Sequence, residues 1–221
     1  MSVGLDTSLA PGWSGLQTHN FSFTVGSNSN RLLVARIVQT AGSTPVFSSS
    51  MTYNGVSLSY SQQSNDINHD AYEEAYLVAP ATGTNTFSVT FSPATPNEYY
   101  LCVYSFYNAA QSAPTSFTDT FGTGTSSSKA VSVTTTGSAI LSQVYLNIQT
   151  VPTPSNLTKT DGATDSVDSD AAATGYLLNA SSGSNTVGWS GWSSSAYSQL
   201  DSVIAPYVAP SARRRAYMSI T

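Results

Sequence analysis

Charged residues are scarce in this chain of 221 residues. Only 9% of its residues are Asp, Glu, Lys or Arg, against roughly 25% in an ordinary globular protein. Hydroxyl side chains are abundant instead, with 39 Ser and 27 Thr. Hydrophobic residues still make up 40% of the chain, so the low charge does not indicate disorder. The sequence therefore predicts a folded protein with a hydroxyl-rich surface.

Basic residues are the scarcest charged type. The chain has seven Lys and Arg residues and 12 Asp and Glu residues, which gives a net charge of −5 and a pI near 4.6. Three of the seven are Arg213, Arg214 and Arg215, which leaves four basic and 12 acidic residues, a charge of −8, for the rest. Binding to nucleic acid requires clustered Lys and Arg that displace the counterions of the phosphates. We therefore expect no nucleic-acid partner.

Cysteine and long apolar runs are also lacking. Cys102 is the one cysteine, which excludes an intrachain disulfide and a cysteine-based zinc cluster; within the run Leu101-Cys102-Val103 we expect a buried, inert thiol. No run reaches the roughly 18 apolar residues of a membrane helix, so we expect no membrane partner. The segment Met1–Asp6 lacks the features of a secretory signal. The lack of a secretory signal in this segment contrasts with the composition of the chain, which is typical of proteins that function outside the cell.

Motifs of catalysis and nucleotide binding are missing as well. The sequence contains no Gly-x-Ser-x-Gly elbow, no P-loop and no dinucleotide fingerprint. The imidazole bases could only be His19 and His69, which we expect at the surface because polar loop residues are mostly exposed. We therefore predict a protein that is not an enzyme and that needs no cofactor.

Alternation of apolar and polar residues dominates what is present. The segments Phe21–Val25, Phe87–Phe91 and Val144–Ile148 each show a period of two, which is typical of half-buried strands. The segments Leu32–Val38 and Tyr99–Tyr107 are almost continuously apolar, as expected of strands buried on both faces. The sequence thus predicts an all-β protein.

Two local segments add detail. Asn54-Gly55 lies between β-forming residues and predicts a tight hairpin turn. The segment Asp70–Val78 is compatible with a helix, but its tyrosines and the following Pro80 fit a strand as well, and we favour the strand.

An internal repeat relates two parts of the chain. Five residues recur at a constant spacing of 100, namely Tyr76, Leu77, Gly83, Asn85 and Thr86 as Tyr176, Leu177, Gly183, Asn185 and Thr186. Chance similarity in a Ser/Thr/Gly/Asn-rich sequence is the alternative. We predict an antiparallel two-sheet β-sandwich, jelly-roll-like and built from two similar halves. One domain would span residues 13–210, with an N-terminal arm at 1–12 and a basic C-terminal tail at 211–221.

Three motifs resemble a β-sandwich domain family of tailed-bacteriophage virion proteins and secreted bacterial surface proteins. They are Asn30-Arg31-Leu32-Leu33-Val34, Thr52-Tyr53-Asn54-Gly55-Val56-Ser57-Leu58, and Ala75-Tyr76-Leu77 followed by Pro80 and Gly83-Thr84-Asn85-Thr86. The resemblance extends over roughly residues 16–210 and departs from the family pattern at Tyr76, where Trp is expected, and in the acidic segment from Asp161 to Asp170. It implies a β-sandwich that serves in structure or attachment, without catalytic residues.

Two acidic clusters are candidates for chemistry. Asp161, Asp165, Asp168 and Asp170 could bind calcium through loop oxygens, although their spacing matches no EF-hand, and a solvated loop is the simpler interpretation. A second cluster could in principle hold a carboxylate pair of the glycosidase type, but a wet strand face or loop is again simpler. Its members are Asp66, Asp70, Glu73 and Glu74.

Tryptophans are candidates for ligand stacking. Gly12-Trp13-Ser14-Gly15 recurs as Gly188-Trp189-Ser190-Gly191, and Trp192 follows. Trp189 continues an alternating strand, so we expect it in the core. Trp13 and Trp192 lie beside glycines at predicted strand ends and are the better candidates for a ligand or interface site.

The C-terminal segment is the candidate for partner binding. Arg213, Arg214 and Arg215 could pair with carboxylates of an acidic partner, including another copy of this chain. Tyr217 and Ile220 lie in a short β-compatible segment that could add to a neighbouring sheet edge.

These features favour a virion structural protein of a tailed phage, as a capsid-decoration, head-fibre or tail-associated subunit. Such a protein would be assembled in the host cytoplasm, bind other virion subunits and form homo-oligomers. The alternative is an extracellular carbohydrate-binding or adhesin module that contacts cell-surface glycans. A weak enzyme of the lectin-like sandwich type lacks any recognisable acid–base pair.

Overall fold

The computed structural model describes residues 1–40, 46–65, 71–92, 98–165 and 169–209. Within these ranges the chain is entirely antiparallel β structure with connecting turns, and it contains no helix. Accordingly, the described part has no helix that could cross a membrane. The all-β prediction is confirmed.

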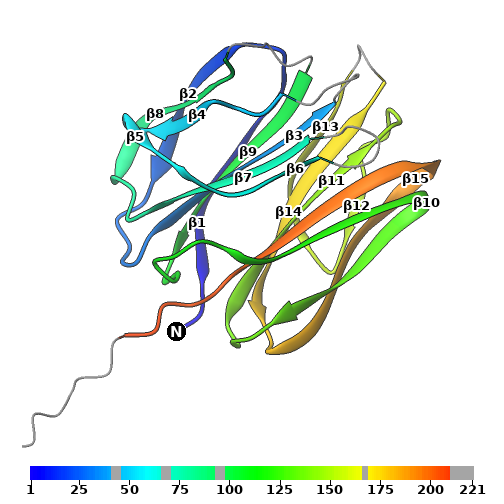
Figure 1. The fold of residues 1–221 in the computed structure, drawn as a ribbon. Coiled ribbons are helices and arrows are strands. Elements are labelled where there is room, and N and C mark those ends of the chain that lie inside the picture. Colours follow the sequence, from blue (N-terminus) through cyan, green and yellow to red (C-terminus); the bar gives the residue numbers. More distant parts are fainter. Residues whose placement is uncertain (41–45, 66–70, 93–97, 166–168, 210–221) are drawn as a thin grey trace, which may run out of the picture.

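Two sheets come from the N-terminal part of the chain (Figure 1). The central sheet has the order β1-β9-β3-β7-β6, with bounds β1 Gly4–Ser14, β9 Glu98–Tyr107, β3 Leu32–Thr40, β7 Ala71–Val78 and β6 Ser59–Asn65. The four-stranded sheet has the order β2-β8-β4-β5, with bounds β2 Thr18–Val25, β8 Gly83–Thr90, β4 Ser50–Tyr53 and β5 Val56–Ser57.

The C-terminal part forms the six-stranded sheet, with the order β10-β15-β11-β14-β13 and with β12 paired to β15. Its bounds are β10 Thr115–Val133, β11 Ser138–Leu146, β12 Thr153–Ser155, β13 Thr158–Thr164, β14 Ala171–Ala180 and β15 Gly183–Ile204. The two longest strands, β10 and β15, have a register shift between Gly124 and Ser126. Beyond it, residues 126–133 and 183–190 cover the rest of their own sheet, because Val131 and Val187 pack with Ile140 and Val203.

The central sheet is buried on both faces. One face packs on the four-stranded sheet through Leu33 and Leu101, which contact a cluster that includes Phe23 and Phe87. The other face packs on the six-stranded sheet through residues such as Val34, which lies in one cluster with Leu141. The inner strands β3 and β9 therefore need apolar residues in both alternations, which explains their continuous apolar runs.

Several local predictions are confirmed. Residues 71–78 form a strand, β7. Asn54 and Gly55 both have positive φ, 50° and 74°, and join β4 to β5 in a tight hairpin. The repeated motif is strand, turn, strand in both copies, as β7–β8 and as β14–β15.

Two features differ from the predicted architecture. Three sheets are present rather than the two of a simple sandwich, since the central sheet carries a layer on each face. Most of residues 1–12 belong to β1, which starts at Gly4 and pairs with β9.

Candidate functional site

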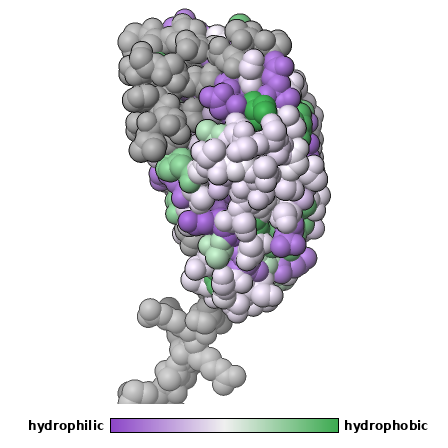
Figure 2. Space-filling model, turned by 90° about the vertical axis from the view of Figure 1, so that its right-hand side faces the viewer, coloured by the Kyte–Doolittle hydropathy of each residue, from purple (hydrophilic) through white to green (hydrophobic). Residues whose placement is uncertain are grey.

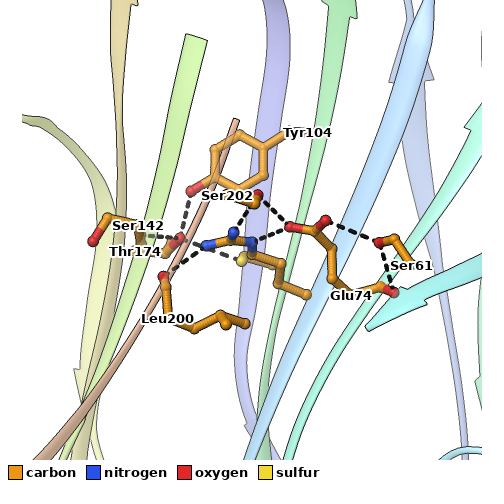
Figure 3. A network of polar contacts seen from close by, with 9 residues as sticks. Ser61, Glu74, Tyr104, Ser142, Thr174, Leu200 and Ser202 are labelled. Atoms are coloured by element: carbon orange, nitrogen blue, oxygen red, sulfur yellow. Dashed lines mark hydrogen bonds and ion pairs between the residues drawn. The ribbon is translucent and has the colours of Figure 1, made fainter. Parts of the chain in front are cut away.

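A polar network that includes Glu74 and Ser202 lies between the central and six-stranded sheets (Figure 3). Arg36 is at its centre, because it bonds residues of both sheets. Its Nε donates to Glu74 Oε2 at 2.8 Å, and both side chains are fully buried. Arg36 Nη1 donates to the Leu200 carbonyl at 3.1 Å, and Nη2 donates to Ser202 Oγ. Ser202 Oγ in turn donates to Glu74 Oε2 at 2.6 Å, and Ser61 Oγ donates to Glu74 Oε1 at 2.9 Å. The network satisfies a charge pair that would otherwise be costly to bury.

A neutral cluster lies beside this ion pair. Tyr104 OH and Thr174 Oγ1 are 2.5 Å apart, and Cys102 Sγ lies 3.4 Å from the same threonine oxygen. Burial raises the pKa of the Cys102 thiol to about 11. The thiol is therefore protonated at neutral pH and unreactive, which agrees with the expectation of an inert, buried cysteine.

Glu73 is held on the opposite face of β7, between the central and four-stranded sheets. Its carboxylate accepts hydrogen bonds from Ser48 N at 2.8 Å, Ser48 Oγ at 2.6 Å and Gln63 Nε2 at 3.1 Å. Burial raises the pKa of Glu73, and the hydrogen bonds from Ser48 oppose that rise. The cluster joins the segment before β4 to the central sheet.

Asp201 is a third buried carboxyl group, inside the six-stranded sheet and its folded-over part. Gln199 Nε2 donates to its two oxygens at 3.1 and 2.9 Å. Burial raises the pKa of Asp201 to about 6, although Arg36 and Lys129 lower it through their charges. Nearby, Trp189 Nε1 donates to Ser142 Oγ at 2.9 Å.

The two glutamates do not form a catalytic pair. Glu73 and Glu74 are adjacent in β7, so their side chains point to opposite faces of the sheet. Both are fully buried, so the expectation of a wet strand face is wrong for these two residues. Asp66 and Asp70 lie outside the described residues. Shielded carboxylates on two sides of a sheet cannot act together on one substrate.

The tryptophans differ in exposure. Trp189 is fully buried, as expected. Trp192 is only 5% exposed and donates from Nε1 to the Gly124 carbonyl at 2.7 Å, so it offers no open face for a ligand. Trp13 is half-buried; its ring lies 5.7 Å from that of Tyr100, and its Nε1 donates to the Ala163 carbonyl at 3.2 Å. Of the two candidates, Trp13 is the one that is partly exposed.

The acidic segment is more buried than a solvated loop. Asp165 and Asp170 are each 4% exposed, and Asp165 N donates to the Asp170 carbonyl at 2.8 Å. Asp161 lies in β13, and its Oδ1 accepts from Gly162 N at 2.7 Å. Asp168 lies outside the described residues. Among the described residues, no three His, Cys, Asp or Glu side chains are grouped so that they could hold a metal ion.

The remaining predicted residues are placed as follows. His19 is half-buried rather than at the surface, with its ring 5.4 Å from Phe21 and 6.4 Å from Tyr99, and burial lowers its pKa. His69, Arg213, Arg214, Arg215, Tyr217 and Ile220 lie outside the described residues.

Sequence reasoning missed the buried ionisable groups Arg36 and Asp201. A signal for Arg36 exists, because it is a lone charge inside the apolar run Leu32–Val38 and such a charge requires a buried partner. No comparable signal marks Asp201, which follows Ser-Gln-Leu in a mixed segment.

Neither a protein-family model nor a curated protein matches the sequence. Among solved structures, the chain is similar to a crystal structure described as a "putative secreted protein from Eubacterium rectale". The two share 10% identity over 86% of this chain and 70% of the other, with a TM-score of 0.23. A likeness this distant carries no argument about function.

Proposed function

We propose that this protein is a non-enzymatic virion structural protein of a tailed bacteriophage, a capsid-decoration, head-fibre or tail-associated subunit that acts by attachment to other virion proteins. The observation that carries the proposal is the chemistry of its outer layers. The motif resemblance to virion and surface domains supports the same class.

The outer layers are almost free of charge. The four-stranded sheet contains no Asp, Glu, Lys or Arg, and the folded-over part, residues 126–133, 153–155 and 183–190, contains only Lys129. Exposed positions alternate with buried ones and carry hydroxyl groups, as at Ser22, Thr24, Thr84 and Thr86. Figure 2 shows a face of the molecule on which residues near neutral hydropathy predominate. Such a surface favours broad contact with other molecules over electrostatic capture of an ion or nucleic acid.

The buried ionisable groups also support a structural role. Glu74 and Glu73 are enclosed between sheets, and Asp201 is enclosed by the fold-over of its own sheet; all three are hydrogen-bonded to neighbouring side chains. An acid or base in catalysis must reach a substrate proton within hydrogen-bond distance. These groups have internal partners instead, so their chemistry serves the fold.

The test is to purify tailed particles from a lysate of cells that carry the gene and to quantify this chain in them by mass spectrometry. The particle-free supernatant is the control. We expect a fixed number of copies per particle that resists washing in high salt. Absence from the particles, with the chain free in the supernatant, would contradict the proposal.

A carbohydrate-binding or adhesin module is the second candidate, favoured by the half-buried Trp13. The ring of Trp13 is partly exposed and could contact a sugar ring. A glycan array probed with the wild-type chain and with Trp13→Ala would show binding that the variant loses. Equal signals from both would remove this candidate.

A further inference from the structure

The strand order of the central sheet is repeated in the six-stranded sheet. The order in the central sheet is β1-β9-β3-β7-β6, and the order in the six-stranded sheet is β10-β15-β11-β14-β13. Each strand of the first order corresponds to the strand at the same place in the second. The four-stranded sheet has a counterpart as well, because β2-β8-β4 corresponds to the second part of β10, the first part of β15 and β12. We call residues 4–107 the first half and residues 115–204 the second half.

Pairing registers make the correspondence specific to single residues. In the first half Leu33 pairs with Leu77, and in the second half Ile140 pairs with Leu177. Leu177 lies 100 residues after Leu77. The turns agree too: Asn85 Nδ2 bonds the carbonyls of Thr82 and Gly83, and Asn185 Nδ2 bonds those of Ser181 and Gly183.

A bulge is conserved between the halves at the edge strands. The register of β6 against β7 shifts between Tyr60 and Gln62, and that of β13 against β14 shifts between Lys159 and Asp161. Tyr60 pairs with Ala75 and Lys159 pairs with Gly175, so the two shifts occupy equivalent positions. Composition alone does not reproduce a bulge at an equivalent register.

Contacts between the halves are reciprocal. Arg36 pairs with Cys102 and Glu74, and Gln143 pairs with Leu200 and Thr174, so Arg36 is equivalent to Gln143. It follows that Tyr104 is equivalent to Ser202, and Glu74 to Thr174. The first half's Tyr104 contacts Thr174, and the second half's Ser202 contacts Glu74. These are the same two positions with the halves exchanged.

At the edges of the stack the reciprocity holds between strands. On one side, β1 of the first half reaches β13 of the second through Trp13 Nε1 and the Ala163 carbonyl. On the other, β10 of the second half meets β6 of the first, where Ser64 Oγ donates to Asp119 Oδ2 at 3.4 Å. Ala163 pairs with Ala172 and Ser64 pairs with Tyr72, which makes these two positions equivalent.

We infer that the chain is a fused dimer: two copies of one module, each with an inner and an outer layer, joined by an isologous interface about a pseudo-two-fold axis. In such an interface position i contacts j and j contacts i. The surface between the central and six-stranded sheets is therefore an association surface whose partner is the other module. Fusion into one chain allows equivalent positions to differ, which accounts for Arg36 opposite Gln143 and Glu74 opposite Thr174.

The decisive test rebuilds one polar contact as a copy of the other. The triple variant Arg36→Gln, Glu74→Thr and Ser202→Tyr would place a Tyr–Thr pair where Ser202 and Glu74 meet. The space is available because the substitutions at Arg36 and Glu74 remove volume next to Ser202. The double variant Arg36→Gln and Glu74→Thr, which lacks the new tyrosine, is the matched control.

We expect the triple variant to melt at least about 4 °C above the double variant, because the tyrosine fills space and regains a hydrogen bond. Ser202→Tyr alone should instead lower the melting temperature, since the ring would collide with Arg36. A triple variant that melts no higher than the double variant would overturn the equivalence of the two contacts.

A second measurement does not depend on these variants folding. Ser112 is exposed in the connection between β9 and β10, so a protease site inserted after it allows the folded full-length chain to be cut once. We expect the two fragments to co-elute at the position of the uncut protein, held by the isologous interface. Fragments that separate, or unfold, on cutting would overturn the inference.

Discussion

Replacing Arg36 with methionine tests the ion pair at the centre of the stack. Arg36→Met keeps an apolar chain of similar length and removes the guanidinium group. Glu74, which is fully buried, would lose its cationic partner and keep the hydroxyl groups of Ser61 and Ser202 as donors. An uncompensated charge would then lie between two sheets.

The expected loss follows from the burial of both partners. Breaking a fully buried pair by removing one side chain costs about 3–5 kcal/mol, a large share of the roughly 5–15 kcal/mol by which domains are stable. The double variant Arg36→Met and Glu74→Leu removes both charges. It leaves the buried hydroxyl of Ser202 without the two side chains that it contacts, whereas Ser61 Oγ still donates to the backbone carbonyl of residue 74 at 3.1 Å. For one such group we expect about 1–3 kcal/mol. The double variant should therefore be more stable than Arg36→Met alone.

Equilibrium unfolding in urea, followed by tryptophan fluorescence, measures these differences. Arg31→Met is the matched control, because Arg31 donates to the carbonyls of Pro80 and Asn28 rather than to a carboxylate. We expect it to cost about 1 kcal/mol. If the double variant were as unstable as Arg36→Met or less stable, the unpaired charge of Glu74 would not be the source of the loss.

Four further predictions concern pH, reactivity, turns and the tail. Burial raises the folded-state pKa of Asp201 to about 6, above the value of roughly 3.9 in the unfolded chain. The contribution of Asp201 to the free energy of unfolding is therefore complete below about pH 4 and is lost as the pH rises through 6. Urea titrations should show that Asp201→Asn removes a loss of about 3 kcal/mol between pH 4 and pH 8; an unchanged pH dependence would contradict this. Cys102, whose pKa burial raises to about 11, should react with Ellman's reagent in denaturant but not in the native protein at pH 8, and fast native labelling would show that the thiol is accessible. Gly83→Ala and Gly183→Ala should each cost about 1–2 kcal/mol of stability, because both residues have positive φ, 86° and 106°. An added methyl group would meet no other atom at either position, so the backbone conformation alone sets this cost. The control Gly124→Ala should cost little, and unequal losses at the two turns would contradict their equivalence. Deleting residues 211–221 should leave the melting temperature unchanged and reduce the occupancy on purified particles, and full occupancy would show that this segment is no anchor.

Local sequence patterns predicted the strands well because they depend on neighbouring residues. The alternation at Phe21–Val25 corresponds to β2, with Phe23 and Val25 buried, and the Asn54-Gly55 pair forms its turn. The polar clusters could not be predicted in the same way. Arg36 meets Leu200 and Ser202 across more than 160 positions of sequence, and no local rule relates such distant residues.

The error in the number of layers explains the errors at the glutamates. In a two-sheet sandwich every strand has one face in the core and one in solvent, so one of two adjacent residues in a strand is expected to be wet. The runs Leu32–Val38 and Tyr99–Tyr107 have no polar alternation, and a strand buried on both faces requires a layer on each side. These two continuous apolar runs therefore predict three layers. Since β7 pairs with β3 inside the same sheet, both Glu73 and Glu74 must then be buried and must each have an internal partner, as the hydrogen bonds to Ser48 and Arg36 provide.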